Sequence, residues 1–216
     1  MTLKSKAFDF NNNFIVTIDG PAGSGKGTIG KLLAQKFKLL YYQSSILYRN
    51  LAISCINQKI NPTNIDEVIE LSRIPQNAQN AELGNEDVAM MASAIAIIPE
   101  VRNNLGKFLI NLIQTTPRIV MEGRDIGTVI APQADLKIFI RADVEIRAKR
   151  RYKELRNKGK KCIMSDILAQ LKARDKKDIE RTIAPLSVPK DSLEIDTSYL
   201  SPTEVINKIE EFISVR

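Results

Sequence analysis

The stretch Phe14-Ile15-Val16-Thr17-Ile18-Asp19, followed at once by Gly20-Pro21-Ala22-Gly23-Ser24-Gly25-Lys26-Gly27-Thr28, decides how this chain folds. Its first six residues are mostly apolar and β-branched, which is typical of a buried parallel strand. Apolar residues at helical spacing follow the glycine-rich segment, from Ile29 to Phe37. The sequence therefore predicts a strand, a glycine-rich turn and a helix, which is the context that a phosphate-binding loop requires.

The glycine-rich segment has the chemistry to bind a phosphate chain. Glycines allow backbone amides to point inward, and the amino end of the following helix adds positive potential. Lys26 supplies a mobile charge for the β and γ oxygens of a nucleotide. We expect the whole loop to bind the nucleotide, through Gly20, Pro21, Ala22, Gly23, Ser24, Gly25, Lys26, Gly27 and Thr28. The alternative is an ordinary glycine-rich turn of an α/β protein.

The loop departs at one position from the strict phosphate-loop pattern, in which a hydroxyl residue follows the lysine directly. Here Gly27 stands between Lys26 and Thr28. We therefore expect Thr28 to bind phosphate, and Mg²⁺ to be held mainly by phosphates and water. The sequence accordingly predicts no metal-ligating side chains.

Composition limits both the class of protein and its chemistry. The chain has 216 residues, 44% apolar and 26% charged, as expected of one globular domain. Its two cysteines lack a pairing or metal-site spacing and its start lacks a signal peptide, so we expect a cytoplasmic protein without a membrane anchor. Histidine is absent, which excludes Ser-His-Asp and Cys-His catalysis. Phosphoryl transfer remains possible, because it depends on positioning and charge stabilisation.

Strands and helices alternate along the rest of the sequence. Strands are expected at 14–19, 39–42, 118–122, 136–141 and 193–196, and helices at 46–57, 65–71, 86–97, 100–114, 144–158, 165–179 and from Ser201 onward. The last helix opens on a capping box, Ser201-Pro202-Thr203-Glu204. Residues 74–85 are expected to form a loop and residues 1–13 a flexible tail. This alternation predicts an α/β fold.

The positive charge of the chain is concentrated in one segment. The net charge is +7, and residues 141–161 contain ten Lys or Arg against three Asp or Glu, so the rest of the chain is neutral. A local excess of this kind favours a polyanionic ligand held by one element. The alternatives are a solvated basic helix and a nucleic-acid-binding surface, and the low aromatic content of 6% argues against the second.

Four groups of polar residues are candidates for a second site that would bind a phosphate acceptor. They are Ser44 with Arg49, Ser93 with Arg102, Arg124 with Asp125, and Arg174 with Asp178 and Arg181. Glycines on both sides of Arg124-Asp125 suggest a turn close to a ligand. From spacing alone, the other groups are better explained as a cap with a solvated arginine, as surface residues, and as an exposed ion-pair stripe.

The sequence resembles a known protein family. Four segments carry the likeness: Gly20–Thr28, Ile46-Leu-Tyr-Arg49, Glu122-Gly-Arg-Asp-Ile-Gly-Thr128, and Ala173-Arg-Asp175 through Arg181-Thr-Ile-Ala-Pro-Leu186. They resemble the motifs of bacterial cytidylate kinases, which are nucleoside-monophosphate kinases. The resemblance implies a P-loop three-layer sandwich with a five-stranded parallel sheet. It further implies a core at 14–43, 118–146 and 165–216, a monophosphate-binding insertion at about 44–117 and a helical lid at about 147–164.

The same resemblance implies roles for individual residues. Arg49, Arg124 and Arg181 would hold the acceptor phosphate, with Ser44 beside them. Arg174 and Asp178 would bind the ribose, and Ser93, Arg102 and Asp125 would recognise the base. Arg147, Arg150 and Arg151 would close over ATP, and the catalytic set would be Lys26, Arg124, Arg150 and Arg181. The expected substrates are ATP, CMP and dCMP, and the expected state is a monomer that binds neither nucleic acid nor membrane.

Two departures from the family pattern lie in the insertion. Gln43 and Ser45 replace an acid and a glycine, and residues 73–87 are too short and polar for the small antiparallel sheet of the family. Other small-molecule kinases of similar architecture remain alternatives, among them UMP/CMP, shikimate and dephospho-coenzyme-A kinases. A nucleic-acid-binding ATPase and a nucleotide sensor without kinase activity are alternatives from other classes.

Overall fold

A computed structural model describes residues 13–76 and 86–215 of the chain. The predicted flexible tail (1–13), apart from Asn13, and most of the predicted loop at 74–85 lie outside the described residues. Contacts divide the chain into a core unit, Met1–Tyr42 with Thr116–Arg216, and an insertion unit, Gln43–Thr115. Residues 147–164, for which the sequence suggested a lid, belong to the core unit.

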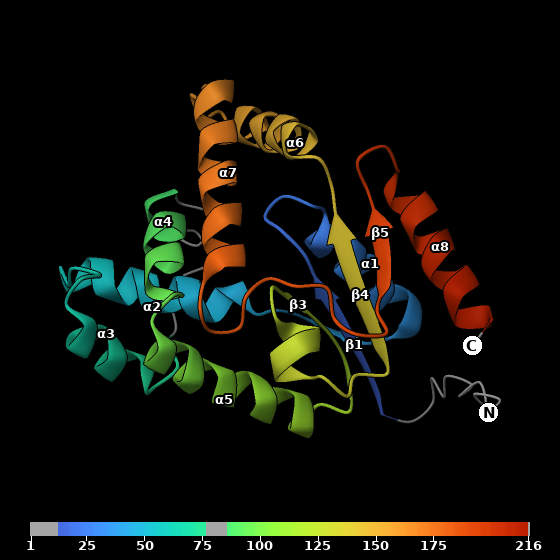
Figure 1. The fold of residues 1–216 in the computed structure, drawn as a ribbon, viewed down its shortest axis with the longest axis horizontal. Coiled ribbons are helices and arrows are strands. Elements are labelled where there is room, and N and C mark those ends of the chain that lie inside the picture. The colour runs from blue at the N-terminus through green and yellow to red at the C-terminus, as the bar shows by residue number, and fades with distance from the viewer. Residues whose placement is uncertain (1–12, 77–85, 216) are drawn as a thin grey trace. The chain divides into compact units, whose positions relative to one another are not determined.

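A five-stranded sheet forms the centre of the core unit (Figure 1). Its strands are β1 (Phe14–Asp19), β2 (Leu40–Gln43), β3 (Arg118–Gly123), β4 (Leu136–Arg141) and β5 (Leu193–Asp196), in the spatial order β2-β3-β1-β4-β5. The pairs β1–β3, β1–β4 and β4–β5 are parallel. The carboxyl ends of β1, β3 and β4 therefore open on the same edge of the sheet, where ligands of such folds bind.

Four helices of the core unit accompany this sheet. They are α1 (Lys26–Phe37), α6 (Val144–Asn157), α7 (Met164–Glu180) and α8 (Pro202–Ser214). Helices α1 and α8 pack on the sheet, and α6 and α7 pack on each other. One core cluster joins alternate residues of β1 and β4 to the apolar faces of α1 and α8, including Val16, Ile138, Leu33 and Ile209. Ser201 caps α8 in the predicted capping box with Glu204. A second cluster joins α6 and α7 to Ala22 of the glycine-rich loop.

Helices form the regular secondary structure of the insertion unit within residues 44–76 and 86–115. It contains α2 (Ser45–Asn57), α3 (Ile65–Ser72), α4 (Glu86–Ile95) and α5 (Pro99–Thr115). Helix α2 packs on α4, and α3 packs on α5. Residues 44–76 and 86–115 contain no strand.

The expected element order is confirmed, and three strands have the predicted bounds, 14–19, 136–141 and 193–196. One element was missed, the π-helical turn η2 (Ile126–Ile130) after β3. The Asp19 side chain accepts hydrogen bonds from the backbone amides of Ile126 and Gly127, at 2.8 and 2.7 Å. Because this turn depends on a residue more than a hundred positions away, local sequence could not reveal it. Among the described helices, none has the length and apolar character needed to span a bilayer.

Candidate functional site

The glycine-rich loop leaves the carboxyl end of β1 and leads directly into α1. Gly25 is the N-cap of the helix and Lys26 its first residue. The Lys26 side chain is folded into the loop and only 7% exposed, and its Nζ donates a hydrogen bond to the Pro21 carbonyl oxygen at 2.7 Å. Burial lowers the pKa of Lys26 well below its usual value, and the positive charge of Arg124 lowers it further. A bound polyphosphate would add further negative charge beside this buried lysine.

Asp19 is a fully buried carboxyl at the root of the loop. Burial raises its pKa to about 6, although its two backbone hydrogen bonds to η2 act in the opposite direction. Asp19 thus connects the strand that carries the phosphate-binding loop to the turn that begins directly after Asp125. The sequence showed it only as the last residue of a strand.

Asp19 should make stability depend on pH. Its folded pKa of about 6 lies above the ordinary 3.8, so the native state holds an additional proton between these values. Its stabilising contribution is therefore complete below the ordinary pKa and is lost as pH rises through the folded pKa. The quantity to compare is the difference in unfolding free energy between the wild type and Asp19→Asn. This difference should become about 2 kcal/mol smaller as the pH rises from about 4.5 to 7.5. Urea denaturation of both chains measures this, and a constant or rising difference would contradict the expectation.

A cluster of two arginines and two aspartates lies in the core unit, beyond the end of β3. Arg124 Nε donates to Asp178 Oδ2 at 2.9 Å. Arg181 reaches Asp178 Oδ1 at 3.8 Å and Asp125 Oδ1 at 3.6 Å, and its side chain is only 5% exposed. The structure thus brings together Arg124, Asp125, Asp178 and Arg181, which are four of the predicted acceptor-binding residues.

The alternative of an exposed ion-pair stripe on α7 does not describe this cluster. Asp178 is buried, and Arg181 lies one residue beyond the end of α7, where its Nε donates to the Ala184 carbonyl oxygen. Burial raises the pKa of Asp178, but the charges of Arg124, Arg174 and Arg181 outweigh burial and hold it below its usual value. The carboxylate therefore stays charged, orients Arg124 by a hydrogen bond and forms a longer ion pair with Arg181.

Three of the four arginines of α6, those expected to close over ATP, contact protein oxygens. Arg147 is buried and donates to the carbonyl oxygens of Ala142 and Ala22 and to Asp175. Arg150 donates to Thr197 and Ser198, in the segment between β5 and α8. Arg151 pairs with Glu154 on its own helix, at 3.0 Å. Arg147 and Arg150 therefore connect α6 to segments that border the phosphate-binding loop.

The insertion unit carries four further predicted residues, Ser44, Arg49, Ser93 and Arg102. Arg102 is 8% exposed, donates to the Ala96 carbonyl oxygen at 3.1 Å and lies 5.7 Å from the centre of the Tyr48 ring. It is therefore not the surface residue that spacing alone suggested. Ser44 is buried at the start of α2, where its side chain makes no capping bond, and Arg49 and Ser93 are half-buried. The two residues that depart from the family pattern bond to each other, Gln43 Nε2 to Ser45 Oγ at 2.9 Å.

Glu122 and Asp175 are candidate residues to which the sequence analysis assigned no role. Glu122 is buried at the carboxyl end of β3, and its charge favours the protonated form of Lys26. It also raises the pKa of Tyr41, after the larger effect of burial. The sequence could have indicated Glu122, because it is a charged residue near the end of a strand that is otherwise apolar after Arg118. Asp175 stands in one of the segments that carry the family resemblance, but its residue type and spacing did not separate it from the other charged residues of α7.

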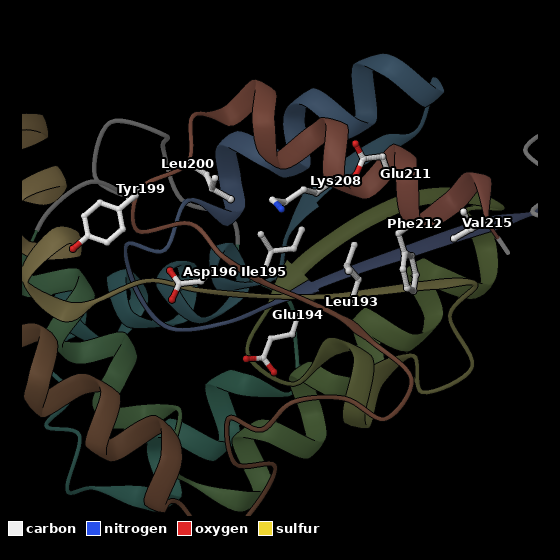
Figure 2. A pocket seen from close by; sticks show the side chains of 10 residues that line it. All are labelled: Leu193, Glu194, Ile195, Asp196, Tyr199, Leu200, Lys208, Glu211, Phe212 and Val215. Carbon is white, nitrogen blue, oxygen red and sulfur yellow. The ribbon is translucent and has the colours of Figure 1, made fainter.

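One cavity lies away from these residues (Figure 2). Its volume is about 710 Å³, and it is lined by β5, the segment between β5 and α8, and the second half of α8 with Val215 after it. Leu193, Ile195, Tyr199 and Phe212 are among its walls. None of the predicted site residues lines it. It is therefore not part of the candidate site.

Comparison with known proteins identifies consistent relatives. The sequence model of the family described as "Cytidylate kinase" matches residues 16–215. A Rickettsia felis protein named "Cytidylate kinase" is 61% identical over 211 residues, which cover 98% of this chain and 96% of that protein. A Rickettsia canadensis protein of the same name is 58% identical over 215 residues, which cover 100% of this chain and 99% of that protein. Shikimate kinase from Bacteroides thetaiotaomicron aligns with a TM-score of 0.51 at 9% identity, over 93% of this chain and 98% of that chain, which concerns the fold alone.

Proposed function

This chain belongs to the cytidylate kinase family, and we propose from this premise that it transfers the γ-phosphoryl group of ATP to CMP and dCMP. The observation that carries the proposal lies in the core unit. A phosphate-binding loop contains a buried lysine, and Arg124 is close enough to lower the pKa of that lysine. Arg124 is itself held, together with Arg181, by the Asp178 carboxylate. Cationic groups for two phosphates thus occur near one edge of the sheet.

The proposed chemistry is a direct, in-line transfer. An acceptor phosphate oxygen is already anionic, so the reaction needs no protein base to activate it. The obstacle is repulsion between the two phosphate groups and the charge of the transferring group. Lys26, Arg124 and Arg181 would neutralise that charge from positions with little exposure to solvent, where electrostatic interactions are stronger than in water.

The core unit would contribute to acceptor binding by orienting its arginine side chains before the phosphate binds. Arginine suits phosphate because its planar guanidinium donates two parallel hydrogen bonds. Asp178 orients the Arg124 guanidinium by a hydrogen bond, and the Ala184 carbonyl oxygen orients that of Arg181, which also pairs with Asp178. Less conformational freedom is therefore lost when phosphate binds. We assign ribose contacts to Asp178 and Arg174, and further acceptor-phosphate contacts to Ser44 and Arg49.

We assign recognition of the base to Asp125, Ser93 and Arg102. Cytosine presents an amino group, from which the Asp125 carboxylate can accept a hydrogen bond. Uracil presents a carbonyl oxygen at the same position, which the carboxylate would repel. Selectivity would therefore come from repulsion as well as from attraction.

The donor side of the proposal involves Mg²⁺ and the basic helix α6. We propose that Mg²⁺ is held mainly by the ATP phosphates and water, where it would neutralise phosphate charge. Within residues 13–76 and 86–215 there is no group of three potential metal ligands. Glu122 is a buried carboxylate two residues before Arg124, which belongs to the cluster of two arginines and two aspartates. Its Oε2 lacks a hydrogen-bond partner among the described residues, so it suits contact with metal-bound water. We propose that Arg150 and Arg151, with Arg147, act on the ATP side, in a cytoplasmic monomer.

A coupled assay of ADP release across the common nucleoside monophosphates tests the function. We expect turnover with CMP and dCMP and at least about tenfold lower kcat/KM with UMP. In Asp125→Asn the side chain keeps its size but gains an amide donor, so the preference for CMP over UMP should fall by roughly tenfold. Asp166→Asn, which changes an exposed carboxylate of α7, serves as the matched control.

Each alternative predicts a different result in that assay. Turnover of shikimate or of another small acceptor, with none of CMP, would identify a different kinase. ATP binding without turnover of any acceptor would support a nucleotide sensor. An unchanged CMP preference in Asp125→Asn would contradict the role of Asp125 while leaving the proposed reaction intact.

A further inference from the structure

The buried side chain of Arg147 joins three segments of the core unit. Its Nε donates to the Ala142 carbonyl oxygen at 2.8 Å, where β4 leads into α6. Its Nη1 donates to the Ala22 carbonyl oxygen in the phosphate-binding loop at 3.1 Å, and its Nη2 contacts Asp175 Oδ2 on α7 at 2.6 Å. Arg147 is only 5% exposed. Because the guanidinium is planar and rigid, these three acceptors are fixed relative to one another.

Asp175 is the only one of these three acceptors that carries a charge. The other two are backbone carbonyls, so Asp175 supplies the negative charge that a buried guanidinium requires. The Cβ of Arg147 also lies against Gly23, at 3.4 Å from the position that a Gly23 Cβ would occupy. Arg147 therefore contacts the loop at two successive residues, Ala22 and Gly23, and Asp175 holds it there.

The hydrogen bond to Ala22 has a consequence for the next amide of the loop. In a trans peptide, the carbonyl oxygen of one residue and the N–H of the following residue point in opposite directions. With the Ala22 carbonyl held toward Arg147, the Gly23 N–H must point away from it. Phosphate-binding loops act through inward-pointing N–H groups of this kind.

We propose that Asp175 is a positioning residue for the phosphate donor, which acts through Arg147 to hold the Ala22–Gly23 peptide in the orientation that binds phosphate. This inference rests on the proposed function, and it adds a residue for which the sequence analysis had assigned no role. Helix α7 then carries two carboxylates with separate tasks. Asp175 orients the donor loop, and Asp178, three residues later, orients the acceptor arginine Arg124.

The experiment compares the affinity for MgATP, measured by equilibrium binding without an acceptor, with KM for CMP. In Asp175→Asn the carboxylate charge is lost at nearly constant size, and Arg147→Lys keeps the charge but cannot reach three acceptors. We expect each variant to weaken MgATP binding by roughly tenfold or more, and to change KM for CMP by no more than about twofold. The double variant should lose little beyond either single variant, because both act through the same contact.

Glu145→Gln is the matched control. Glu145 on α6 pairs with Lys172 on α7, so it joins the same two helices, but both side chains are more than half exposed. It should leave MgATP affinity unchanged. If Asp175→Asn and Arg147→Lys weakened MgATP binding and CMP binding to the same extent, general helix packing would explain the result and the proposal would be overturned. The same holds if Glu145→Gln weakened MgATP binding as much as Asp175→Asn does. Unchanged MgATP affinity in Asp175→Asn would overturn it outright.

The same measurements separate this inference from the proposed function. If the wild-type chain binds MgATP but transfers nothing to CMP, the proposed function fails. The effect of Asp175→Asn on MgATP affinity would still decide the positioning role, because that binding measurement needs no acceptor.

Discussion

Replacing Lys26 with methionine should lower kcat for phosphoryl transfer by about 10²–10³-fold without unfolding the protein. The lysine ammonium lies inside the phosphate-binding loop, where it is nearly inaccessible to water. A charge in that position stabilises the transferring group far more than a solvated one would. Methionine has a similar length but supplies neither charge nor hydrogen bond.

Stability should respond to Lys26→Met in the opposite direction from activity. Burial lowers the pKa of Lys26, which means that the folded state disfavours its charge. An uncharged side chain of similar volume should therefore leave the melting temperature unchanged or raise it. Steady-state kinetics and thermal denaturation of the same preparation measure both effects.

Lys36→Met provides the control for that substitution. Lys36 lies in the last turn of α1 and forms an exposed pair with Glu210. Exposed pairs contribute at most about 1 kcal/mol, so this variant should keep its activity and nearly all its stability. If Lys26→Met retained transfer near the wild-type rate, the phosphate-binding role of the loop would be refuted.

Replacing Gly20 with alanine should have the largest effect on the fold. The residue has a φ of +148°, and an added Cβ would lie 2.0 Å from the backbone oxygen of Ile140 in β4. That oxygen belongs to a central strand, so it cannot move away without breaking the sheet. We expect a loss of about 4 kcal/mol or more in the free energy of unfolding, seen as a melting temperature lower by about 10 °C or as failure to fold.

Gly159→Ala separates steric overlap from backbone strain. Gly159 also has a positive φ, +71°, but no atom lies within 4 Å of its Cβ position. This variant should lose only the strain of a left-handed residue, about 1–2 kcal/mol. Similar losses in Gly20→Ala and Gly159→Ala would show that the approach of β4 to the loop is not what requires glycine.

The sequence predicted most of the fold because its signals are local. The bounds of β1 and β4 follow from short segments rich in apolar residues, and the start of α8 follows from a capping box. The phosphate-binding loop was equally visible, because its glycines and Lys26 are consecutive in the chain. In each case, neighbouring residues contain the whole signal.

Long-range contacts produced the features that were missed. The turn η2 depends on Asp19, and the orientation of the Ala22 carbonyl depends on Arg147, which Asp175 holds in turn. Each contact joins residues that are 28 or more positions apart in the sequence. Charged residues on α6 and α7 look alike in sequence, whether they are exposed or buried.

The sequence by itself determined that this chain has a phosphate-binding loop on a parallel α/β sheet, and it contained the motifs of a nucleotide kinase. Only the tertiary structure decided which of the many charged residues are buried and which partners they hold. Asp178 serves two arginines, and Asp175 serves the arginine behind the donor loop. The physical reason is that secondary structure follows from local backbone and side-chain preferences. The strength and direction of a charge depend instead on burial and on partners that only the folded chain brings together.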